Sequence, residues 1–517
     1  LAEVEGLRLQ PAERAALEAV DVPAPADAFY ELRWQQAPQL AALSGGPVAG
    51  SWVVVAAPGL RAATALGARL ADCVIVEPRR LRALLEQRPV PASVVCIWEE
   101  ADADMPPMTA LRLSHEALDV VQVLAERPPA RLWWVTGWAV AVHKDDPVAI
   151  ALSPLWGLGR TLMQEQPELG CTLIDLPPGL ESTEWLLAEL VAGDDENQLA
   201  WRAGRRYAAR LVRAAAAAGR PAARAPLPGT VLVTGGLGAL GLQVARWLAR
   251  QGVAHLLLLG RRGLRTPGAG AAAAALQALG ARVTVATVDV EQRAELEATL
   301  AALPKKLPLR GVIHAAGELD DGVLSEQTAA RFSRVFQPKV TGAWNLHELT
   351  AGHDLEFFVL FSSVTALLGA AGQGNYAAAN SFLDALAVYR QARGLKGQSL
   401  GWGTWSGAGL AAALDAVKQA RLSRQGLKWL SPDEGVALFA QACTRAEAQL
   451  AVARLDLRVA GRADGATLPP LWRLLAPGSE QAAEITPGSL GARLAALSPA
   501  RREIELRSAV QEEVARV

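Results

Sequence analysis

The sequence predicts an α/β protein with two doubly wound parallel sheets, one in each half of the chain. Apolar runs of four to seven residues alternate with helix-length segments through both halves. Such continuous runs are typical of strands that helices cover on both faces. A segment rich in alanine, proline and arginine at 213–229 interrupts the alternation and is expected to be a linker. The chain is therefore expected to contain two subdomains, at 28–212 and 230–460.

The first subdomain is expected to carry five strands, separated by helices such as those at 60–71 and 115–126. Its strands are expected at 52–56, 73–76, 93–98, 132–136 and 172–176. A phosphate-binding loop needs several glycines after an early strand, but the segment SWVVVAAPGLRAATA contains only one. We therefore interpret this subdomain as truncated and structural, without a bound nucleotide.

The second subdomain shows the alternation more clearly and is expected to be the catalytic one. Its strands are expected at 230–234, 255–259, 282–288, 311–314, 357–361 and 398–402. Helical patterns follow or separate these runs, which is the layout of a doubly wound sheet. The tail at 461–517 is rich in proline and alanine before it turns helical.

The composition argues against several classes of function. The 517 residues carry a formal net charge of −1, which gives no reason to expect a nucleic-acid or membrane-surface partner. The four cysteines form no CxxC pair and the six histidines show no HExxH spacing, so we expect neither a disulfide framework nor a metal site. A signal segment and an apolar run of about 18 residues are both missing, so a cytoplasmic protein is expected.

A glycine-rich turn follows the first strand of the second subdomain. After the strand TVLVT, the segment GGLGALG places three glycines at the GxGxxG spacing. In Rossmann-like folds the first glycine allows a tight turn, the second lets the backbone approach a pyrophosphate, and the third lets the helix pack on the strand. Both subdomains are thus interpreted as Rossmann-like, and only the second as nucleotide-binding. The cofactor contacts expected here are Thr234, Gly236, Leu237, Gly238, Leu240 and Gly241.

Two arginines at the end of the second strand of this subdomain favour NADPH as the cofactor. An NAD enzyme places an acidic residue there against the ribose hydroxyls, whereas this chain has Arg261 and Arg262. Guanidinium groups suit a 2′-phosphate, and the alternative is a pair of solvated loop arginines. Further cofactor contacts are expected where the third and fourth strands end, from Asp289, Val290, Ala315, Ala316 and Gly317.

One tyrosine stands where a reductase needs a proton donor. Reduction of a ketone takes hydride from one side and a proton at the oxygen. Tyr376 begins a helix, Ser363 ends the strand before it, and Asn380 lies one turn after the tyrosine on the same face. Each of these residues alone has an ordinary structural explanation, as a core side chain or a helix cap.

This set resembles the short-chain dehydrogenase/reductase superfamily, and within it the ketoreductases of modular polyketide synthases. The superfamily pattern is Tyr-x-x-x-Lys, but this chain has Asn380 at the lysine position. In these ketoreductases lysine and asparagine have exchanged places, and a context similar to FQPKVTGAWNLHEL identifies the lysine as Lys339. The resemblance implies that Lys339 orders the ribose and lowers the pKa of Tyr376, the proton donor. It also implies that Ser363 polarises the carbonyl and that Asn380 holds the network or a water.

The resemblance covers nearly the whole chain. FYELRW and SPLWGLGR are similar to the family's structural subdomain, and RLSRQGLKWLSPDEGVALF is similar to its helical lid. The implied substrate is a 3-ketoacyl chain held by phosphopantetheine on an acyl carrier protein, with neighbouring synthase domains as further partners. Residues 1–27 would then be a linker after a preceding domain, and 461–517 a linker toward the carrier protein.

Four positions bear on the stereochemistry that the resemblance implies. In this family a Leu-Asp-Asp at the place of Leu319, Asp320 and Asp321 accompanies B-type reduction, which gives a D-configured 3-hydroxyl. A-type enzymes carry a tryptophan eight residues before the tyrosine, where this chain has Leu368. B-type reduction is therefore expected, and an acidic surface turn is the alternative for the two aspartates.

Two positions of the chain bear on its comparison with the family. No proline follows Tyr376 at Ala378 or Ala379, which argues against the epimerising B subtype, and Thr404 stands where relatives often have proline. A free-standing dehydrogenase is one alternative. The Tyr-x-x-x-Asn pattern argues against it, and so does the first half without a cofactor loop, which a free-standing reductase does not need. A non-catalytic scaffold between synthase domains is the other, although such a domain should have lost a glycine or a catalytic residue.

Overall fold

The computed structural model describes residues 27–40, 46–99, 105–179, 181–215, 227–406, 426–456 and 469–475. The linkers expected at 1–27, 213–229 and 461–517, and the first part of the expected lid, lie largely outside these residues. Within the described ranges, no helix is both long and apolar enough to cross a membrane. The same ranges contain no cluster of His, Cys, Asp or Glu side chains suited to a metal ion.

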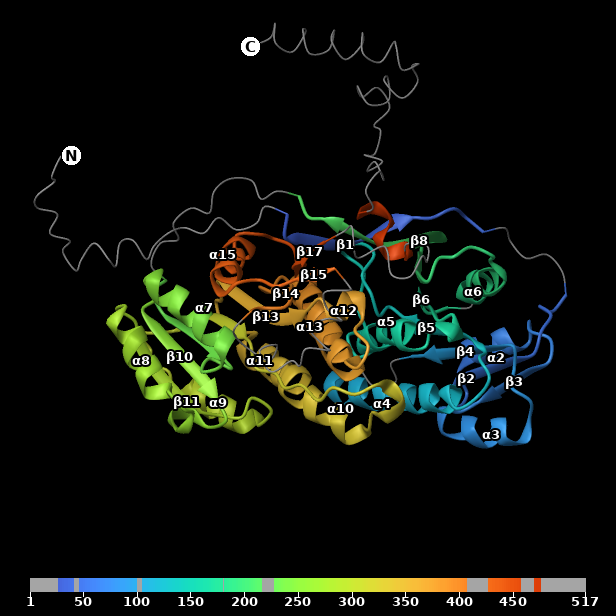
Figure 1. Cartoon of the computed structure of the whole chain (residues 1–517), viewed down its shortest axis with the longest axis horizontal. Coiled ribbons are helices and arrows are strands. Elements are labelled where there is room, and N and C mark those ends of the chain that lie inside the picture. The colour runs from blue at the N-terminus through green and yellow to red at the C-terminus, as the bar shows by residue number, and fades with distance from the viewer. Residues whose placement is uncertain are drawn as a thin grey trace, which may run out of the picture.

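Strands from both halves form one continuous sheet (Figure 1), and β15 (Leu427–Lys428) and β17 (Arg454–Leu455) pair separately. In chain order its strands are β1 (Phe29–Gln36), β2 (Trp52–Ala56), β3 (Cys73–Val76), β4 (Ser93–Trp98), β5 (Arg131–Gly137), β6 (Thr172–Leu176), β7 (Gln198–Arg202), β8 (Arg205–Arg213), β9 (Thr230–Thr234), β10 (His255–Gly260), β11 (Arg282–Thr287), β12 (Leu309–His314), β13 (Phe357–Ser363), β14 (Gln398–Trp402) and β16 (Gln449–Val452). Their order among the described residues is β11-β10-β9-β12-β13-β14-β16-β1-β8-β7-β6-β5-β4-β2-β3. Every strand predicted from the sequence is present, which confirms the α/β fold class.

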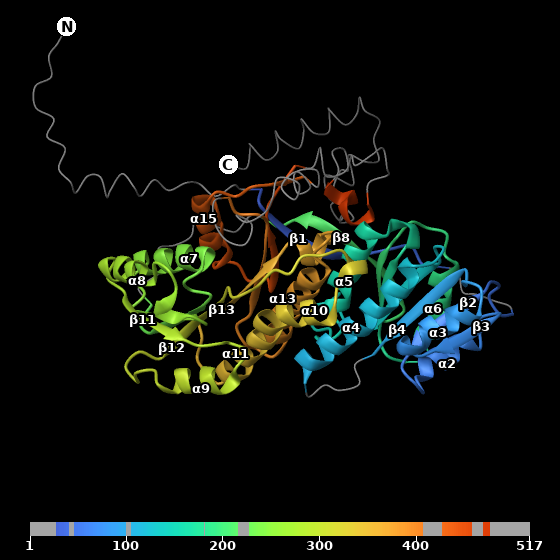
Figure 2. The same ribbon diagram turned by 60° about the horizontal axis from the view of Figure 1, so that its bottom comes forward.

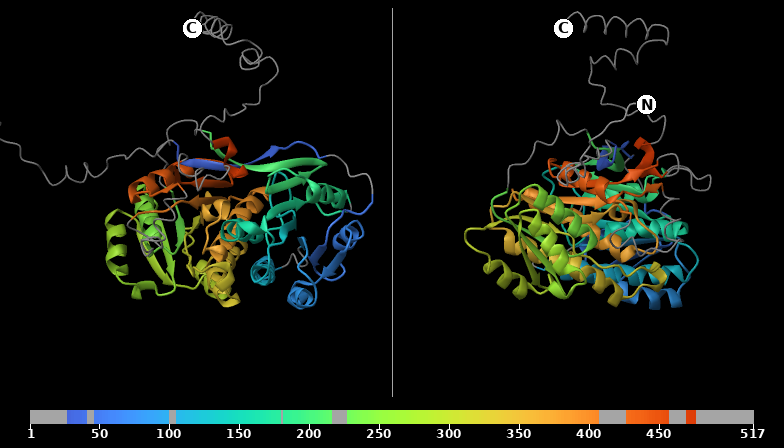
Figure 3. Two further views of the ribbon diagram at one scale, coloured as in Figure 1. Left: turned by 45° about the vertical axis from the view of Figure 1, so that its right-hand side comes forward. Right: turned by 60° about the vertical axis from the view of Figure 1, so that its left-hand side comes forward.

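Four strands join the two parallel halves edge to edge. β1 pairs antiparallel with β16 through Phe29 and Tyr30, and with β8 along most of its length. Figure 3 shows β1, in blue, running beside β8. β7 and β8 then form an antiparallel hairpin at the end of the first half's sheet. β1, β7, β8 and β16 are not among the predicted strands, and they make one sheet where the sequence suggests two.

Helices of the two halves pack against each other below this junction (Figures 1 and 2). The helices are α2 (Arg61–Gly67), α3 (Leu81–Gln87), α4 (Pro106–Ala125), α5 (Pro154–Glu165) and α6 (Glu181–Val191), then α7 (Ala239–Arg250), α8 (Ala269–Ala278), α9 (Arg293–Ala301), α10 (Ala329–Phe336), α11 (Gly342–Thr350), α12 (Thr365–Leu368), α13 (Gly374–Ala392) and α15 (Pro432–Ala442). α4 contacts α10, and α5 lies along α13. α5 and α13 touch backbone to backbone, since a Cβ on Gly157 would lie 2.3 Å from the carbonyl oxygen of Ala377.

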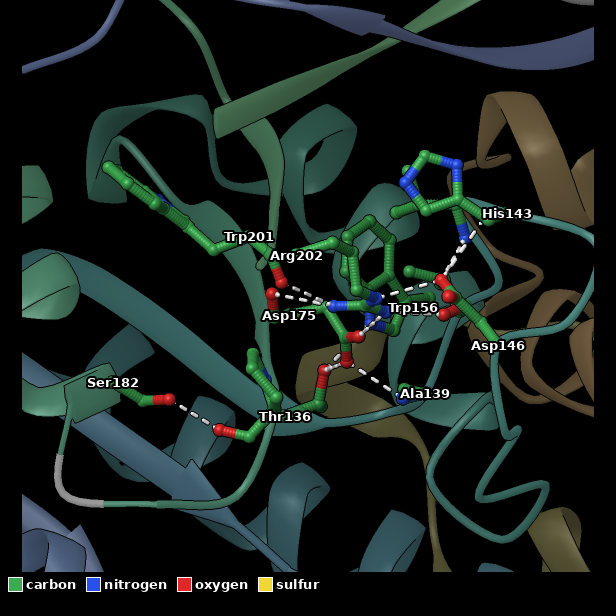
Figure 4. Close-up of polar contacts among 12 residues, drawn as sticks. Thr136, Ala139, His143, Asp146, Trp156, Asp175, Ser182, Trp201 and Arg202 are labelled. Atoms are coloured by element: carbon green, nitrogen blue, oxygen red, sulfur yellow. Dashed lines mark hydrogen bonds and ion pairs between the residues drawn. The ribbon is translucent and has the colours of Figure 1, made fainter. Parts of the chain in front are cut away.

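A buried polar network occupies the carboxyl ends of β5 and β6 in the first half (Figure 4). One carboxylate oxygen of Asp175 accepts hydrogen bonds from Thr136 Oγ1 at 2.6 Å and from the Ala139 amide at 2.7 Å. Its other oxygen accepts from Arg202 at 2.6 Å, and the same guanidinium pairs with Asp146 at 2.8 Å. Ligands of α/β proteins bind at this edge of the sheet, and here protein side chains satisfy one another instead.

Candidate active site

A cavity of about 1050 Å³ opens at the carboxyl ends of the strands in the second half. Its lining includes the ends of β10 and β13 and the turns that follow β9 and β12. β9 and β12 are neighbours in the sheet although two strands separate them in the chain. The cavity thus lies where the strand order reverses, which is the position at which open α/β sheets bind ligands.

The glycine turn after β9 forms one wall of this cavity. Gly235 has a φ of +63°, and a Cβ on it would lie 2.8 Å from the carbonyl oxygen of Ala315. Gly235, and not Gly236 as predicted, therefore makes the tight turn, because only glycine fits this left-handed and crowded position. A Cβ on Gly241 would lie 2.3 Å from the Gly235 oxygen, which is the close packing expected of the third glycine. Gly238 is the N-cap of α7, so the free amides of that helix face the cavity.

Two residues of the predicted cofactor set lie behind this wall and outside the lining. Gly236 packs on β9 and β10, where a Cβ would meet Val233 O at 2.8 Å. Thr234 is fully buried, and its hydroxyl bonds His314 Nδ1 at 2.7 Å and accepts from the Ala316 amide at 3.2 Å. Thr234 thus holds the turn after β12 in place. The predicted cofactor residues that do line the cavity are Leu237, Gly238, Leu240, Gly241, Arg261, Arg262, Asp289, Val290, Ala315, Ala316 and Gly317.

The end of β10 presents positive charge to the cavity. β10 ends at Gly260, and Arg261 and Arg262 follow it in the lining, so no carboxylate occupies the place of an NAD-type acid. Arg261 pairs with Glu318 at 3.1 Å, and both side chains are accessible to solvent. A glycine cradle and helix amides at one end of a cavity suit the phosphates of a dinucleotide, and the guanidinium groups add positive charge there.

The structure brings the four predicted catalytic residues together. Ser363 ends β13, Tyr376 lies in the first turn of α13, and Lys339 lies on a π-helical turn at Gln337–Thr341. These three residues line the cavity, whereas Asn380 is fully buried behind them. π-helical turns occur frequently at functional sites.

Hydrogen bonds connect Lys339, Asn380 and Tyr376. The Lys339 ammonium donates to Asn380 Oδ1 at 2.9 Å and to the Phe361 carbonyl at 3.0 Å. The Asn380 amide in turn donates to the Tyr376 carbonyl at 2.8 Å, one turn back along α13. The Lys339 nitrogen lies 5.0 Å from the centre of the Tyr376 ring. α13 has Asn380 where the superfamily pattern has a lysine, and Asn380 holds Lys339, which comes from another helical segment, in place.

Burial controls the protonation of these groups. It raises the pKa of Tyr376 to about 12, against an opposing hydrogen bond from Asn380. It lowers the pKa of Lys339 to about 7, and the carboxylate of Asp384 opposes that change. Loss of solvent is the largest cause of the raised pKa of Tyr376. The expected lowering of this pKa by Lys339 stays a prediction.

The Leu-Asp-Asp segment divides into two roles. Leu319 and Asp321 line the cavity, and Asp321 accepts a hydrogen bond from Gln373 at 3.2 Å. Asp320 lies outside the lining, where its carboxylate pairs with Arg331 at 2.8 Å and Arg334 at 2.6 Å on α10. Asp320 therefore anchors the segment to a helix.

Leu368 also lies outside the cavity lining. It ends α12 and packs against a core cluster around Tyr30 and Leu367.

Several cavity residues are absent from the predicted set. Trp402, the last residue of β14, lines the cavity together with Gly403, Thr404 and Trp405 that follow it. The two tryptophan rings are 5.1 Å apart in an edge-to-face arrangement. Position is their only signal in the sequence, since they lie at or just after the end of a predicted strand of the same sheet.

Each half of the chain matches a known protein family. Residues 229–407 match the family model "KR domain", and residues 32–211 match "Polyketide synthase extender module SpnB, Rossmann fold domain". The chain is 41% identical over 447 residues to polyketide synthase GfsA of Streptomyces halstedii. It is 40% identical over 330 residues to the pikromycin polyketide synthase component PikAIII of Streptomyces venezuelae. These matches cover 83% and 63% of this chain but only 6% and 21% of the two relatives.

Solved structures match over most of their own length. A structure of A-type ketoreductases from a modular polyketide synthase shares 35% identity at a TM-score of 0.77, covering 86% of this chain and 97% of the other. The first ketoreductase of the tylosin synthase shares 34% identity at a TM-score of 0.72, covering 84% and 94%.

Proposed function

Since this chain belongs to the ketoreductase domains of modular polyketide synthases, we propose that it is an NADPH-dependent, B-type 3-ketoacyl-thioester reductase. Domains of this family reduce ketoacyl intermediates. The proposed product is a D-3-hydroxyacyl thioester, formed without epimerisation of the 2-position. The substrate is proposed to reach the cavity on the phosphopantetheine arm of an acyl carrier protein.

The observation that carries this proposal is the set of Lys339, Ser363, Tyr376 and Asn380 around one cavity. A bound nicotinamide would supply hydride to the 3-carbon of the substrate. The Tyr376 hydroxyl would donate its proton to the carbonyl oxygen, and the hydroxyl of Ser363 would donate a hydrogen bond to the same oxygen. A raised pKa keeps Tyr376 protonated at neutral pH, as a proton donor requires.

Lys339 and Asn380 are proposed to order the ribose and hold the tyrosine in place. Lys339 is already oriented by Asn380 and by a carbonyl of β13, so binding costs little reorganisation. The pKa of Lys339 would rise beside a negatively charged group of a bound cofactor, since an opposite charge favours the protonated amine.

The choice of NADPH over NADH rests on Arg261 and Arg262 at the end of β10. Both side chains are exposed, so they can turn toward a 2′-phosphate without crossing the core. The Glu318 partner of Arg261 would be exchanged for the phosphate when the cofactor binds.

B-type stereochemistry is proposed from Leu319 and Asp321 in the cavity lining and from leucine rather than tryptophan at 368. Asp320 is assigned an anchoring role through Arg331 and Arg334. The absence of proline at Ala378 supports reduction without epimerisation.

The division of labour between the halves is also a proposal. Residues 28–212 would form the structural subdomain and 230–460 the catalytic one, with a linker at 213–229. The buried network around Asp175 and Arg202 supports this, because it occupies the edge of the sheet that would otherwise bind a ligand.

The test mixes the chain with NADPH and a racemic 2-methyl-3-ketoacyl thioester, follows the nicotinamide absorbance, and resolves the products by chiral chromatography. A D-configured alcohol is expected. Tyr376→Phe should lower kcat by about 100- to 10,000-fold while NADPH binding persists. Tyr389→Phe, on the same helix but outside the cavity lining, is the matched control.

The outcomes separate the parts of the proposal. An L product would keep the reductase and overturn the B-type assignment. No turnover with a carrier-bound substrate, despite NADPH binding, would instead support a scaffold that spaces synthase domains.

A further inference from the structure

The last residue of α5, in the first half, reaches two backbone segments of the second half. Glu165 Oε2 accepts a hydrogen bond from the Leu324 amide at 2.6 Å. Glu165 Oε1 accepts one from the Gly372 amide at 2.7 Å. One carboxylate therefore connects two segments that lie about fifty residues apart in the chain.

Both segments form the wall of the cavity beside Tyr376. The first segment, 319–324, contributes Leu319, Asp321, Gly322 and Val323 to the lining, and the second, 370–373, contributes all of its residues. They also bond each other, since the Gly322 amide donates to the Gly372 carbonyl at 2.8 Å. Gly372 is thus bonded through its amide to Glu165 and through its carbonyl to the other segment.

Glu165 is an unfavourable residue for the C-terminal end of α5. A carboxylate in the last turn faces the negative end of the helix dipole, which disfavours it. Glu165 is half-buried, so solvent screens this repulsion only in part. Two charge-assisted hydrogen bonds to amides outside the helix offset that cost. A residue that breaks a local rule in this way is expected where function requires it.

The rest of α5 holds the chain that leads into the second segment. Arg160 donates to the Ala366 carbonyl at 2.6 Å, and Thr161 Oγ1 accepts from the Ala370 amide at 3.4 Å. Gly369, at a φ of +71°, packs so tightly that a Cβ would lie 2.4 Å from the Arg160 carbonyl. These contacts fix the backbone up to residue 370, and Glu165 extends this support to the cavity wall.

We propose that Glu165 is a positioning residue that sets the spacing of segments 319–324 and 370–373, and thereby the orientation in which the ketoacyl chain enters beside Tyr376. This inference rests on the proposed function. It assigns a part of stereochemical selection to the half of the chain that lacks the cofactor. Glu165 does not line the cavity itself, so it acts through the two segments.

The test compares Glu165→Gln with the wild-type chain in the reductase assay, using the racemic 2-methyl-3-ketoacyl thioester. Glutamine keeps the size of the side chain but can accept from only one of the two amides. We expect kcat/KM for the thioester to fall about tenfold and the share of minor stereoisomers to rise. The dissociation constant for NADPH should stay within about twofold of the wild-type value, because the cofactor residues are not touched. Glu168→Gln, three residues later and exposed, removes the same charge and should leave all three quantities unchanged.

A second variant, Glu165→Ala, removes both bonds and should broaden the stereoisomer distribution further. The melting temperature of Glu165→Ala is measured as well. A purely structural role of Glu165 would lower this temperature without changing the product ratio. A wild-type product ratio in both variants overturns the inference, whatever their stability. If the wild-type chain itself oxidises no NADPH, the proposed function has failed, and that result is distinct from this one.

Discussion

At the scale of single residues, the site depends on a buried lysine and on a partly buried tyrosine that faces the cavity. Lys339 keeps two hydrogen bonds inside the protein, and Tyr376 faces the cavity with a raised pKa. Neither state follows from the residue types, because pKa values respond to burial and neighbours. Asn380 is the connecting residue, since its amide group bonds both the lysine and the tyrosine backbone.

The two arginines after β10 predict a specific change in cofactor preference. Replacing Arg261 and Arg262 with alanine should raise the KM for NADPH at least tenfold, since each charge-assisted hydrogen bond contributes about 1.5–3 kcal/mol. The KM for NADH should change little. Initial rates with both cofactors measure the ratio, and Arg265→Ala, nearby but outside the cavity lining, is the control. An unchanged preference would exclude the role in 2′-phosphate binding.

A buried histidine predicts a loss of stability in mild acid. His347 Nδ1 accepts a hydrogen bond from Arg390 at 2.9 Å, and burial, with Arg390, lowers its pKa to about 4. The unfolded chain binds a proton near pH 6.5, so it holds more protons than the folded chain between pH 6.5 and 4. The stability that the neutral ring contributes is therefore present at pH 7 and lost as the pH falls through that window.

We expect this histidine alone to cost about 1–2 kcal/mol of unfolding free energy between pH 7 and pH 5. Urea unfolding at the two pH values measures the loss. His347→Gln retains an acceptor for Arg390 but cannot titrate. The unfolding free energy of this variant should therefore fall by about 1–2 kcal/mol less than that of the wild-type chain between the two pH values. An equal loss in both proteins would contradict the prediction.

At the scale of elements, the active-site helix depends on a helix from the other half. α5 packs along α13 with Gly157 against Ala377, the neighbour of Tyr376. The sequence SPLWGLGR shows two glycines in a helix, where each costs about 1 kcal/mol relative to alanine. Only the packing explains Gly157, because the backbone of α13 occupies the space that a side chain at this position would need.

Gly157→Ala should therefore destabilise the protein, although alanine favours helix formation. The added Cβ would lie 2.3 Å from a backbone oxygen, so the helices must separate, at a cost of about 1–3 kcal/mol. We also expect kcat to fall, since the shift reaches Tyr376. Urea unfolding and NADPH oxidation measure the two effects. In Gly159→Ala, the new methyl group meets the flexible end of Leu173, so a smaller effect is expected and an effect of equal size would refute the explanation.

At the scale of the whole molecule, one strand makes two subdomains into a single sheet. β1 pairs with β16 of the second half and with β8 of the first. Its first residue, Phe29, is buried in the same core cluster as Trp402 and Trp405 of the cavity wall. Without β1, the edge strand β16 would expose unpaired backbone groups, which promotes aggregation.

A chain that begins at residue 227 should therefore fail to fold as an independent reductase. It would lose β1, β8 and the packing of α5 on α13. Circular dichroism on heating should show no cooperative transition for residues 227–475, whereas residues 27–475 should melt cooperatively. A cooperative transition at the temperature of the longer chain would show that the second half is self-sufficient.

The sequence by itself predicted eleven strands of the sheet, the order of the motifs and the candidate catalytic residues, whose roles stay a prediction. These features are local: apolar runs predict strands, and Gly238, Gly241, Ser363 and Tyr376 occupy fixed places relative to them. The first glycine was misplaced by one residue, because the spacing of GGLGALG does not say which glycine adopts a positive φ, and the structure identifies Gly235.

Only the tertiary structure decided how the halves cooperate. Pairing of β1 with β16, packing of Gly157 on Ala377 and the two bonds of Glu165 all join residues far apart in the chain. It also separated Leu319 and Asp321, which face the cavity, from Asp320, which binds α10. Such contacts depend on the relative placement of elements, whereas hydrophobic periodicity reports only which face of each element is buried.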